Sequence, residues 1–416
     1  MTKKASTPAL RFKGFTYTWE QRKLGDIMNV TSVKRIHQSD WTDSGIRFLR
    51  ARDIVSASKN EEPDDYLYIS KEKYDEYSLV SGKVAIGDLL VTGVGTIGVP
   101  YLIRNSEPLY FKDGNIIWFQ NGAKIDGDFF LYSFFGKAIQ DFINESAGIG
   151  TVGTYTIESG KKTPISLPEM KEQQQIGAYF RNLDHLITLH QRKYDKLTNM
   201  KKSMLEKMFP KNGANVPEIR FKGFTYTWEQ RKLSEVADFY TGNGLSWNDI
   251  SENGKQECIL YGNLYTDYGM ITDTVVYRTD AEIKTPVYSE FGDVLIPASD
   301  TTPTGLARAT SIEKSGVLLG GDINIVRPKN GINGSCLSLA INANKGELIK
   351  LIKGTTVRHI HNSEIQGVAV ALPTDLREQE TITDYFKNLD RLITLHQREL
   401  EKLKNLKKAC LEKMFV

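Results

Sequence analysis

Two stretches of the chain repeat mostly apolar residues at alternating steps of four and three. This spacing, sustained for about five heptads, is that of a coiled-coil seam. At about 1.5 Å per residue, roughly 38 residues would form a helix of about 57 Å. We therefore expect two long helices that pair with each other, most simply antiparallel. The seam positions are Ile176, Phe180, Leu183, Ile187, His190, Tyr194, Leu197, Lys201, Met204 and Met208 in the first stretch, and Ile382, Phe386, Leu389, Ile393, His396, Leu400, Leu403, Lys407, Cys410 and Met414 in the second.

Polar residues interrupt each seam. His190 and His396 have no second metal-binding side chain at a helical spacing, so we interpret them as residues that fix register rather than as catalysts or metal ligands. Leu186, Leu189 and Leu205 widen the apolar face of the first helix enough for a further partner. The basic residues of this helix suit either a DNA-facing edge or a solvated face, and the sequence does not decide between them: Arg192, Lys193, Lys201, Lys202 and Lys207.

The two blocks outside the helices, at roughly 25–167 and 234–372, have a mixed α/β pattern. Short runs rich in β-branched and aromatic residues, bounded by Gly, Pro, Asn and Asp, predict strands at 87–92, 98–103, 115–119, 293–297 and 322–326. Apolar periodicity predicts a shorter helix at 128–144.

The chain is a tandem duplication. The segment RFKGFTYTWEQRKL occupies residues 11–24 and recurs without a change at 220–233, and the helix at 172–209 matches that at 378–415. Fainter pairs link the blocks: Gly87-Asp88 with Gly292-Asp293, Thr151-Val152 with Thr356-Val357, and Leu167-Pro168 with Leu372-Pro373. Because the flanking segments are repeated while the blocks between them differ, we predict one fold that presents two different surfaces. We expect a globular domain at 1–167, a helix at 168–210, a second domain at 211–372 and a second helix at 373–416.

Composition narrows the class of protein. The 416 residues are 40% hydrophobic and 25% charged, which is typical of a globular protein, and the length suggests about two to four domains. Neither a membrane span nor an apolar signal-peptide core is present, so we expect a cytoplasmic protein. The three cysteines are far apart, which disfavours structural zinc and disulfides. A net charge of +3 permits a basic face but does not argue for one.

One motif, Gly93-Val-Gly95-Thr-Ile-Gly98, fits the GxGxxG fingerprint of dinucleotide-binding turns. A helix should open on those glycines, yet an extended stretch with Pro100 follows, and no acidic residue ends a second strand about twenty residues on. We interpret the motif as a glycine-rich turn between strands.

Basic, amide and aromatic side chains gather in the loops of both blocks. Arg, Asn and Gln can contact guanine or adenine edges bidentately, whereas Lys and hydroxyl groups mostly hold phosphates. As a set, these residues are our candidates for DNA contact: Lys34, Arg35, His37, Arg47, Arg50, Arg52 and Lys112 in the first block, and Asn243, Trp247, Asn248, Tyr261, Asn263, Arg308, Arg358, His359 and His361 in the second.

Catalytic motifs are missing from the sequence. It contains no GxxxxGK[ST], GxSxG or HExxH pattern, and no [NDS]PP[YF] tetrapeptide typical of amino-methyltransferases. The sequence therefore predicts a protein that recognises a ligand without catalysis, and no metal site.

Together these features resemble one family, the specificity subunits of type I restriction–modification enzymes. The matching features are the RFKGFTYTWEQRKL opening, the Gly-Asp strands, the Leu-Pro closure and the following helix with YF, NLD and LITLHQR, each present twice in the family's order. The resemblance covers the whole chain, as target-recognition domain, spacer helix, target-recognition domain and spacer helix.

The resemblance implies that each recognition domain reads one half of an interrupted double-stranded DNA target. The two helices would form an antiparallel pair that sets the distance between half-sites, and a rigid spacer of this length suits half-sites about 34 Å apart. It also implies partners: two methyltransferase subunits with S-adenosylmethionine and the active site for a flipped adenine, and restriction subunits with ATP and Mg²⁺. Because the two blocks differ, we expect an asymmetric target.

Two other interpretations remain open on the residues alone. The chain would be a tandem DNA-binding regulator if it bound its target tightly without partners. It would be a coiled-coil scaffold if it showed no DNA retention at low ionic strength, because phosphate contacts make DNA binding strongly salt-dependent. A nicotinamide-dependent enzyme ranks last.

Overall fold

The computed structural model describes residues 7–59, 61–63, 65–147, 153–211, 213–354 and 356–416. Thr151 and Val152, noted above as a pair, lie outside the described residues, as do residues 1–6. The chain forms two compact units. Unit 1 comprises Met1–Gln191 and Arg398–Val416, and unit 2 comprises Arg192–Gln397. The boundaries fall inside the two long helices, so each unit holds one α/β part and segments of both helices.

Unit 1 contains two four-stranded sheets and a short strand pair. The main sheet has the order β2-β9-β6-β7, formed by Asn29–Thr31, Ile116–Gln120, Leu89–Thr92 and Pro100–Leu102, with all neighbours antiparallel. The second sheet has the order β3-β5-β4-β8, formed by Trp41–Thr42, Leu67–Ile69, Ile46–Leu49 and Leu109–Phe111. β1 (Glu20–Lys23) pairs antiparallel with β10 (Pro164–Leu167).

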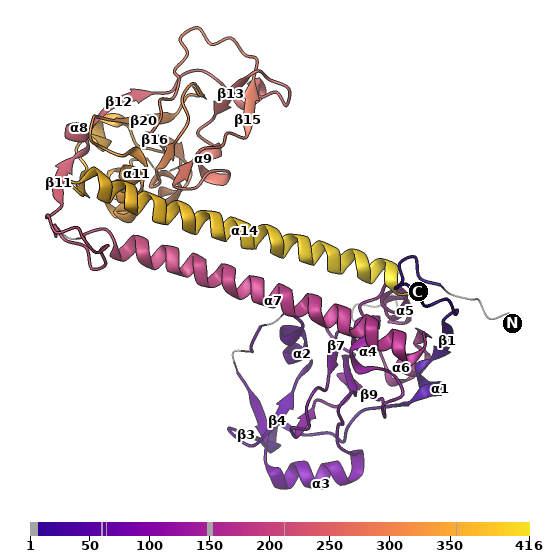
Figure 1. Cartoon of the computed structure of the whole chain (residues 1–416). Helices are drawn as coiled ribbons and strands as arrows, with labels where there is room; N and C mark the ends of the chain where they lie inside the picture. The colour runs from indigo at the N-terminus through magenta and orange to yellow at the C-terminus, as the bar shows by residue number, and fades with distance from the viewer. Residues whose placement is uncertain (1–6, 60, 64, 148–152, 212, 355) are drawn as a thin grey trace. The chain divides into compact units, whose positions relative to one another are not determined.

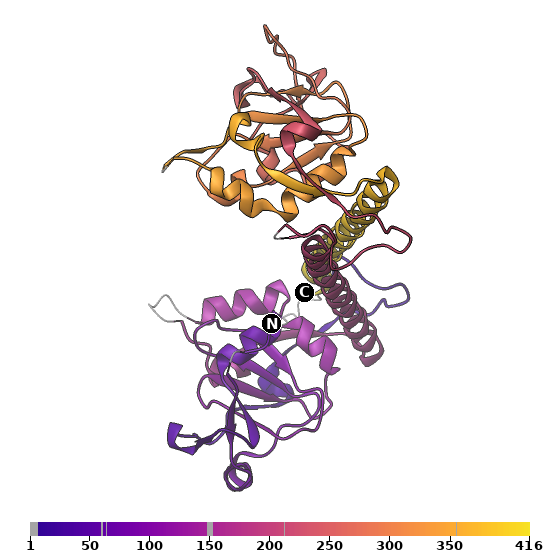
Figure 2. The ribbon, with the colours of Figure 1, turned by 90° about the vertical axis from the view of Figure 1, so that its left-hand side faces the viewer.

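The main sheet of unit 1 is buried on both faces. Leu89 and Val91 pack toward the helices, whereas Leu90, between them, packs toward the second sheet with Phe111 and Trp118. Successive strand residues point to opposite faces, so a strand covered on both sides has a continuous apolar run. The helices of unit 1 before the long one are α1 (Leu24–Ile27), η1 (Gln38–Asp40), α2 (Ala51–Ser58), α3 (Lys71–Ser81), α4 (Gly127–Ser133), α5 (Lys137–Ser146) and α6 (Ile157–Lys162). α3 lies on the side of unit 1 that is far from the long helix (Figures 1 and 2).

Unit 2 repeats this plan. Its main sheet has the order β12-β20-β16-β18-β14, formed by Ala237–Thr241, Ile323–Pro328, Asp293–Pro297, Thr310–Ile312 and Ile271–Thr272. The second sheet has the order β15-β13-β19, formed by Tyr277–Thr279, Gln256–Ile259 and Leu318–Leu319. Two strand pairs complete it: β11 (Glu229–Lys232) with β22 (Ala369–Leu372), and β17 (Ser299–Asp300) with β21 (Arg358–His359).

The same alternation buries both faces of this sheet, because Val294 and Ile296 pack toward the helices and Leu295 toward the second sheet. The shorter helices of unit 2 are α8 (Leu233–Val236), η2 (Trp247–Asp249), α9 (Asn263–Thr266), α10 (Pro303–Leu306), α11 (Gly334–Ala343), α12 (Lys345–Leu351) and α13 (Asn362–Ile365).

The two long helices, α7 (Met170–Lys207) and α14 (Leu376–Met414), pair within each unit (Figure 1). In unit 1 the start of α7 packs against the end of α14, where Phe180 shares a core with Cys410 and Met414. In unit 2 the end of α7 packs against the start of α14, where Met208 shares a core with Phe386. The paired segments therefore run antiparallel, as predicted, and every predicted seam position is buried or half-buried.

The seam lysines are ion-paired across the helices. In unit 1 Lys407 Nζ lies 2.6 Å from Asp184, and in unit 2 Lys201 pairs with Asp390. Lys201 is thereby engaged inside the helix pair, so it is a poor candidate for a DNA-facing edge.

Two sequence expectations about local structure have clear outcomes. The glycine-rich motif at 93–98 is the turn of an antiparallel hairpin between β6 and β7, as predicted, with Gly95 and Gly98 at φ +76°. The single helix expected at 128–144 is wrong, because α4 and α5 are separate helices. Gly136 marks the break, and a Cβ there would lie 3.0 Å from both Ser133 O and the Phe415 side chain.

Candidate nucleic-acid interface

The loops that differ between the units leave the main sheet at one end. In unit 1, β2 and β6 end where the antiparallel β9 and β7 begin, so segments 32–37, 93–99 and 112–115 emerge together. The N–H of Gly93 donates to Asn115 O at 2.8 Å, which ties two of these loops. In unit 2, segments 242–246, 298–309 and 320–322 emerge in the same way, and the N–H of Ala298 donates to Asp322 O at 2.8 Å.

The opposite end of each sheet meets the long helix and holds the residues that the two halves share. Gln173 accepts a hydrogen bond from the Asp126 N–H (3.0 Å) and donates to Pro168 O (2.9 Å). Gln379 repeats this with Asn333 N–H (2.7 Å) and Pro373 O (2.9 Å). The glutamine after the Leu-Pro closure therefore docks the long helix onto the shorter helix that follows the sheet.

The repeated opening segment is anchored at the same end. Arg11 forms a bidentate pair with Glu172 at 2.6 and 2.7 Å, and Arg220 forms the same pair with Glu378 at the same distances. Both glutamates are buried, with side chains 0% and 1% exposed. These hydrogen bonds raise the pKa of both arginines, and bidentate pairing of this kind is among the strongest polar contacts in proteins.

The shared Gly-Asp pair has a structural role in both units. Gly87 and Gly292 have φ values of +92° and +87°, a region that favours glycine. The carboxylate that follows closes the turn: Asp88 accepts from Ala85 N–H at 2.9 Å and Trp118 Nε1 at 2.8 Å, and Asp293 accepts from Glu290 N–H at 2.8 Å. The sequence matches near the helix end thus reflect folding rather than recognition.

In unit 1 the structure brings three of the candidate residues around one loop. Arg35 lies 3.5 Å from Asp113 and remains 68% exposed, and Lys112 lies 3.7 Å from the same carboxylate. Lys34 lies 4.0 Å from the Tyr77 ring centroid on α3, and its backbone N–H donates to Ser81. His37 is exposed nearby, where its N–H is capped by Asp40 at the start of η1. Asp113 faces two of these cations and Glu76 lies 3.9 Å from Lys34, so three cations against two carboxylates leave this loop end basic.

A second group lies along β4 and α2. The Arg47 guanidinium stacks at 3.6 Å over the Tyr66 ring, a cation–π contact. Arg50 is held by Asp53 (2.8 Å) and Asp65 (3.0 Å), and its side chain is only 16% exposed. Hydrogen bonds from Arg50 and then Arg52 lower the pKa of Asp65 to about 2. Arg50 therefore stabilises the turn into α2, which leaves Arg47, and Arg52 on the far side of its exposed pair with Asp65, as the other cations of this group.

In unit 2 several aromatic and basic candidates lie close to one another. Trp247 is 54% exposed and lies next to Gly262, whose added Cβ would be 3.6 Å from the indole. Tyr261 and Tyr265 stand edge to face at 6.3 Å, and Arg308 donates to Tyr265 O at 2.7 Å.

The β17–β21 pair extends this surface. Tyr265 donates to Ser299 O, Ser299 contacts His359 Nδ1 at 2.9 Å, and the rings of His359 and His361 stack at 6.1 Å. Arg358 is half-buried beside them, and Asn243 and Asn248 are exposed in the neighbouring loop. Aromatic faces mixed with basic groups suit contact with nucleic acid.

Two candidates in unit 2 serve the protein itself. Asn263 is 0% exposed and closes the turn before α9 by accepting from Leu260 N–H at 2.9 Å, so its proposed DNA contact does not fit this structure. Its short polar side chain favours a hydrogen bond within a turn as much as base contact, and only burial tells the two apart. Arg308 is half-buried, and burial lowers its pKa.

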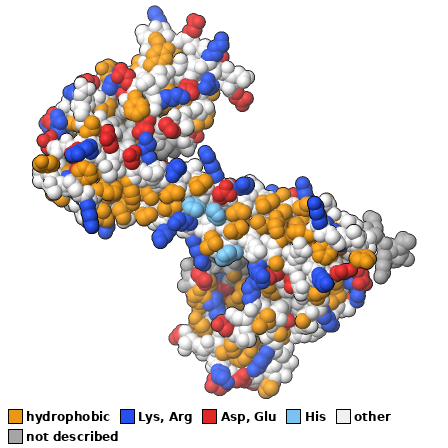
Figure 3. All heavy atoms as spheres, viewed as in Figure 1, with side chains coloured by type: hydrophobic (Ala, Val, Ile, Leu, Met, Phe, Trp, Pro, Cys, Tyr) orange, Lys and Arg blue, Asp and Glu red, His pale blue; other side chains and the backbone are white. Residues whose placement is uncertain are grey.

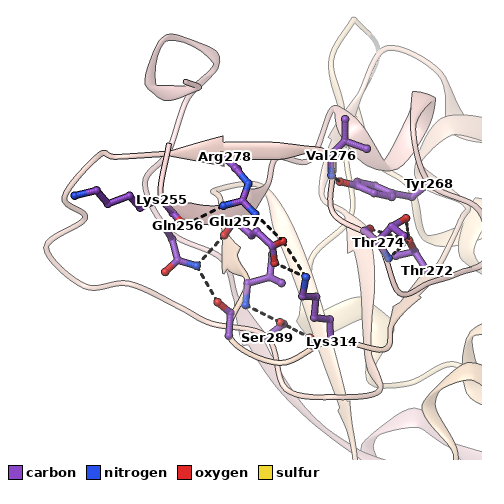
Figure 4. Close-up of polar contacts among 12 residues, drawn as sticks. Lys255, Gln256, Glu257, Tyr268, Thr272, Thr274, Val276, Arg278, Ser289 and Lys314 are labelled. Atoms are coloured by element: carbon purple, nitrogen blue, oxygen red, sulfur yellow. Dashed lines mark hydrogen bonds and ion pairs between the residues drawn. The ribbon is translucent and has the colours of Figure 1, made fainter. Parts of the chain in front are cut away.

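Equivalent positions of the second sheets carry opposite charges. Phe48 pairs with Tyr110 in parallel β4–β8, and Cys258 pairs with Leu318 in parallel β13–β19, so Arg47 and Glu257 occupy the same register position. Figure 4 shows Glu257 between Arg278 at 3.3 Å and Lys314 at 2.6 Å. The next hydrogen bond along each strand pair agrees with this equivalence. In unit 1 the N–H of Lys112 donates to Leu49 O, and in unit 2 the N–H of Gly320 donates to Ile259 O. The same strand position therefore carries a cation in unit 1, and in unit 2 a carboxylate that is neutralised by Arg278 and Lys314.

Sequence reasoning missed several residues of these surfaces. Tyr66, Tyr77, Tyr265 and Ser299 join them through contacts with residues distant in sequence. No local pattern marks such partners, although an aromatic residue within a variable block was a weak signal. Among the residues that the structure describes, no cluster of His, Cys, Asp and Glu suits a metal ion, and no helix is long and apolar enough to cross a membrane.

Comparison with known proteins identifies a family that matches both halves of the chain. The family described as type I restriction modification DNA specificity domain matches residues 17–199 and again 226–405. The MjaVIII type I restriction enzyme specificity subunit of Methanocaldococcus jannaschii is 25% identical over 293 residues, which span 67% of each chain. The putative MjaX specificity subunit of the same organism is 24% identical over 404 residues, or 94% of this chain and 91% of that one.

Solved structures share the fold. The S subunit of a type I restriction–modification system from M. genitalium aligns with a TM-score of 0.57 at 15% identity over 99% of both chains. A structure described as the basis of complex assembly and conformational transition of the type I R-M system aligns with a TM-score of 0.51 at 17% identity, over 96% of this chain and 98% of that one. Because the family matches both halves and most of the chain, this protein belongs to the type I restriction–modification DNA specificity family, as a specificity subunit with two target-recognition domains.

Proposed function

We propose that the chain reads an asymmetric, bipartite double-stranded DNA target, with one half-site for each unit. The observation that carries this proposal is the register equivalence of Arg47 and Glu257. The half-buried Arg47 guanidinium of β4 pairs with no carboxylate in the part of the chain that the structure describes, and it suits a guanine edge or a phosphate. The Glu257 carboxylate, by contrast, is neutralised by Arg278 and Lys314 and puts no cation at the same position. Two units that carry side chains of opposite charge at the equivalent position should not prefer the same bases.

The surrounding loop ends support the same conclusion. Unit 1 offers basic side chains around Asp113, and unit 2 offers Trp247, tyrosines and stacked histidines instead. The residues that the halves share serve the fold at the opposite end of each sheet. The divergent residues thus lie where a ligand would be read.

The chain would also be the scaffold of the complex without being its catalyst. Methyltransferase subunits would bring S-adenosylmethionine, and restriction subunits would bring ATP and Mg²⁺. The long helices expose apolar side chains that suit partner helices, among them Leu186, Leu189, Leu395 and Leu406, at 41–52% exposure. Hydrophobic side chains are visible among basic ones along these helices in Figure 3.

Domain exchange tests the reading of half-sites. Residues 25–167 would be replaced by the corresponding block of another specificity subunit, and residues 234–372 in a matched second variant, each expressed with the methyltransferase. We expect sequencing of methylated DNA to show one changed half-site per variant, on opposite sides of the gap. A single exchange that alters both half-sites, or neither, would contradict the proposal.

A further inference from the structure

One short turn is built in the same way in both units. It follows the loops that leave β2 and β12, at the end of each main sheet where the units differ. We call residues 36–40 of unit 1 and 245–249 of unit 2 the anchored turn. It contains the short helix η1 in unit 1 and η2 in unit 2. Both copies stand at the same distance from the repeated opening segment, so they correspond residue by residue.

The first residue of the anchored turn is buried in the core of the second sheet. Ile36 shares a core with Phe48 of β4, and Leu245 shares a core with Cys258, at the same position of β13. Leu245 keeps this place at a φ of +56°, a left-handed conformation that is unfavourable for leucine. The core contact therefore fixes where each turn begins.

An aspartate closes the anchored turn in both units. Asp40 accepts from the His37 N–H at 3.1 Å. Asp249 accepts from the Ser246 N–H at 2.6 Å and from the Ser246 hydroxyl at 2.8 Å, and these two hydrogen bonds lower the pKa of Asp249. A turn that is buried at one end and closed at the other holds the backbone between them in place. Such preorganisation lowers the cost of binding a ligand.

The residue between these two fixed points is exposed, and it differs between the units. It is Gln38 in unit 1 and Trp247 in unit 2. Among the residues that the structure describes, the Gln38 side chain makes no hydrogen bond. Trp247 is 54% exposed, and its ring stands edge to face against Tyr277 at 5.5 Å. A side chain so exposed contributes little to the stability of its own unit. The anchored turn thus joins a constant backbone to an exposed side chain that has changed completely.

We propose that the anchored turn reads a base in each half-site, with Gln38 contacting an adenine and Trp247 contacting the methyl group of a thymine. This inference rests on the proposed function. A glutamine amide accepts from adenine N6 and donates to adenine N7, and an apolar ring packs against the methyl group that thymine presents in the major groove. The exposed Lys34 and Arg35, shortly before Gln38, would hold the neighbouring phosphates.

A base analogue tests the contact of Gln38. Each adenine of the half-site that domain exchange assigns to unit 1 would be replaced in turn by 7-deazaadenine, which lacks the N7 acceptor. Fluorescence anisotropy with the assembled complex measures the affinity. We expect one replacement to weaken the unaltered chain at least about fivefold and to have no effect on Gln38→Ala, which has already lost the contact. Asn105→Ala is the control, because this exposed amide follows β7 at the opposite end of the sheet.

A second analogue tests the contact of Trp247. Each thymine of the half-site assigned to unit 2 would be replaced by deoxyuridine, which lacks only the methyl group. We expect one replacement to weaken the unaltered chain about fourfold, the effect of one buried methyl group, and to have no effect on Trp247→Ala. Phe291→Ala is the matched control, because this ring is 70% exposed before β16, at the opposite end of the sheet.

The outcomes separate the two proposals. A methylation motif that does not depend on this chain would overturn the proposed function itself. Analogues that leave the unaltered chain unaffected, or that weaken Gln38→Ala and Trp247→Ala as much as the unaltered chain, would overturn the role of the anchored turn alone. Trp247→Ala that weakens binding to every DNA sequence equally would also overturn it, because the ring would then contact DNA without reading a base. Circular dichroism of each variant would show that the units remain folded.

Discussion

At the scale of single residues, polar side chains divide between the fold and the ligand by burial. Arg220 and Arg35 are both arginines beside carboxylates, yet the first is 14% exposed against a buried glutamate and the second is 68% exposed. A buried charge left without its partner is costly, whereas an exposed pair contributes little. The sequence identifies Arg220 as part of the repeated segment and Arg35 as a candidate for DNA contact. Only the structure shows that Arg220 anchors the fold and that Arg35 is exposed.

Replacing Arg220 should destabilise unit 2. Arg220→Ala leaves the Glu378 carboxylate, 1% exposed, without its bidentate partner, so we expect a loss of about 3–5 kcal/mol in the free energy of unfolding. Urea denaturation followed by fluorescence measures it. Arg231→Ala is the control, because the Arg231–Glu235 pair is 37% and 52% exposed and should contribute at most about 1 kcal/mol. Equal stability of the two variants would refute the anchoring role.

Replacing Arg35 should affect DNA binding rather than stability. If Arg35 contacts a phosphate, Arg35→Ala reduces the slope of log affinity against log salt by about 1 for the assembled complex. Arg50→Ala is the matched control, because its guanidinium is held by Asp53 and Asp65 and its loss should destabilise unit 1 instead. Fluorescence anisotropy at several salt concentrations measures the slope. An unchanged slope for Arg35→Ala would remove this residue from the interface.

At the scale of elements, the sequence predicts what periodicity and repetition encode. The seam of α7 and α14, the strands β6, β9, β16 and β20, and the hairpin at 93–98 all follow from local patterns. The break between α4 and α5 does not, because the apolar period continues through it and the close packing of Gly136 is tertiary. The sequence likewise did not predict that Asn263 is buried or that Arg47 stacks on Tyr66, because burial and contacts with distant residues leave no local signal.

The long helices should act as a spacer between the half-sites. We expect a paired insertion of one heptad in α7 and α14, after Gln191 and after Gln397, to keep the seam in register and to lengthen the non-specific gap of the target. An insertion or deletion of one turn within 197–205 of α7 should also change the gap while leaving both half-sites intact. Methylated-DNA sequencing reports the outcome, and altered half-site bases with an unchanged gap would contradict a spacer role.

At the scale of the whole molecule, the duplication extends to the way each unit is closed. In unit 2 the N–H of Ile219 donates to Lys207 O at 3.0 Å, and in unit 1 the N–H of Leu10 donates to Lys413 O at 2.9 Å. Phe209 packs near Phe386, and Phe415 packs near Phe180. Leu10 and Lys413 of unit 1 therefore make the contact that Ile219 and Lys207 make in unit 2.

A circular permutant should therefore fold. Joining Val416 to Met1 connects Phe415 to Leu10 by a segment one residue longer than the segment between Phe209 and Ile219. The new termini can be opened between Pro210 and Lys211. We expect a melting temperature within a few degrees of the parent and the same DNA target. Failure of this permutant to form a folded, partner-binding chain would show that the terminal contacts of unit 1 are not equivalent to the loop of unit 2.

The central claim is that one repeated frame reads two different half-sites. Sequencing the methylated DNA of a host that carries only this chain and its methyltransferase tests it most directly. We expect a single interrupted motif whose two half-sites differ in sequence, with a fixed non-specific gap. A palindromic motif, an uninterrupted motif or no motif that depends on this chain would contradict it.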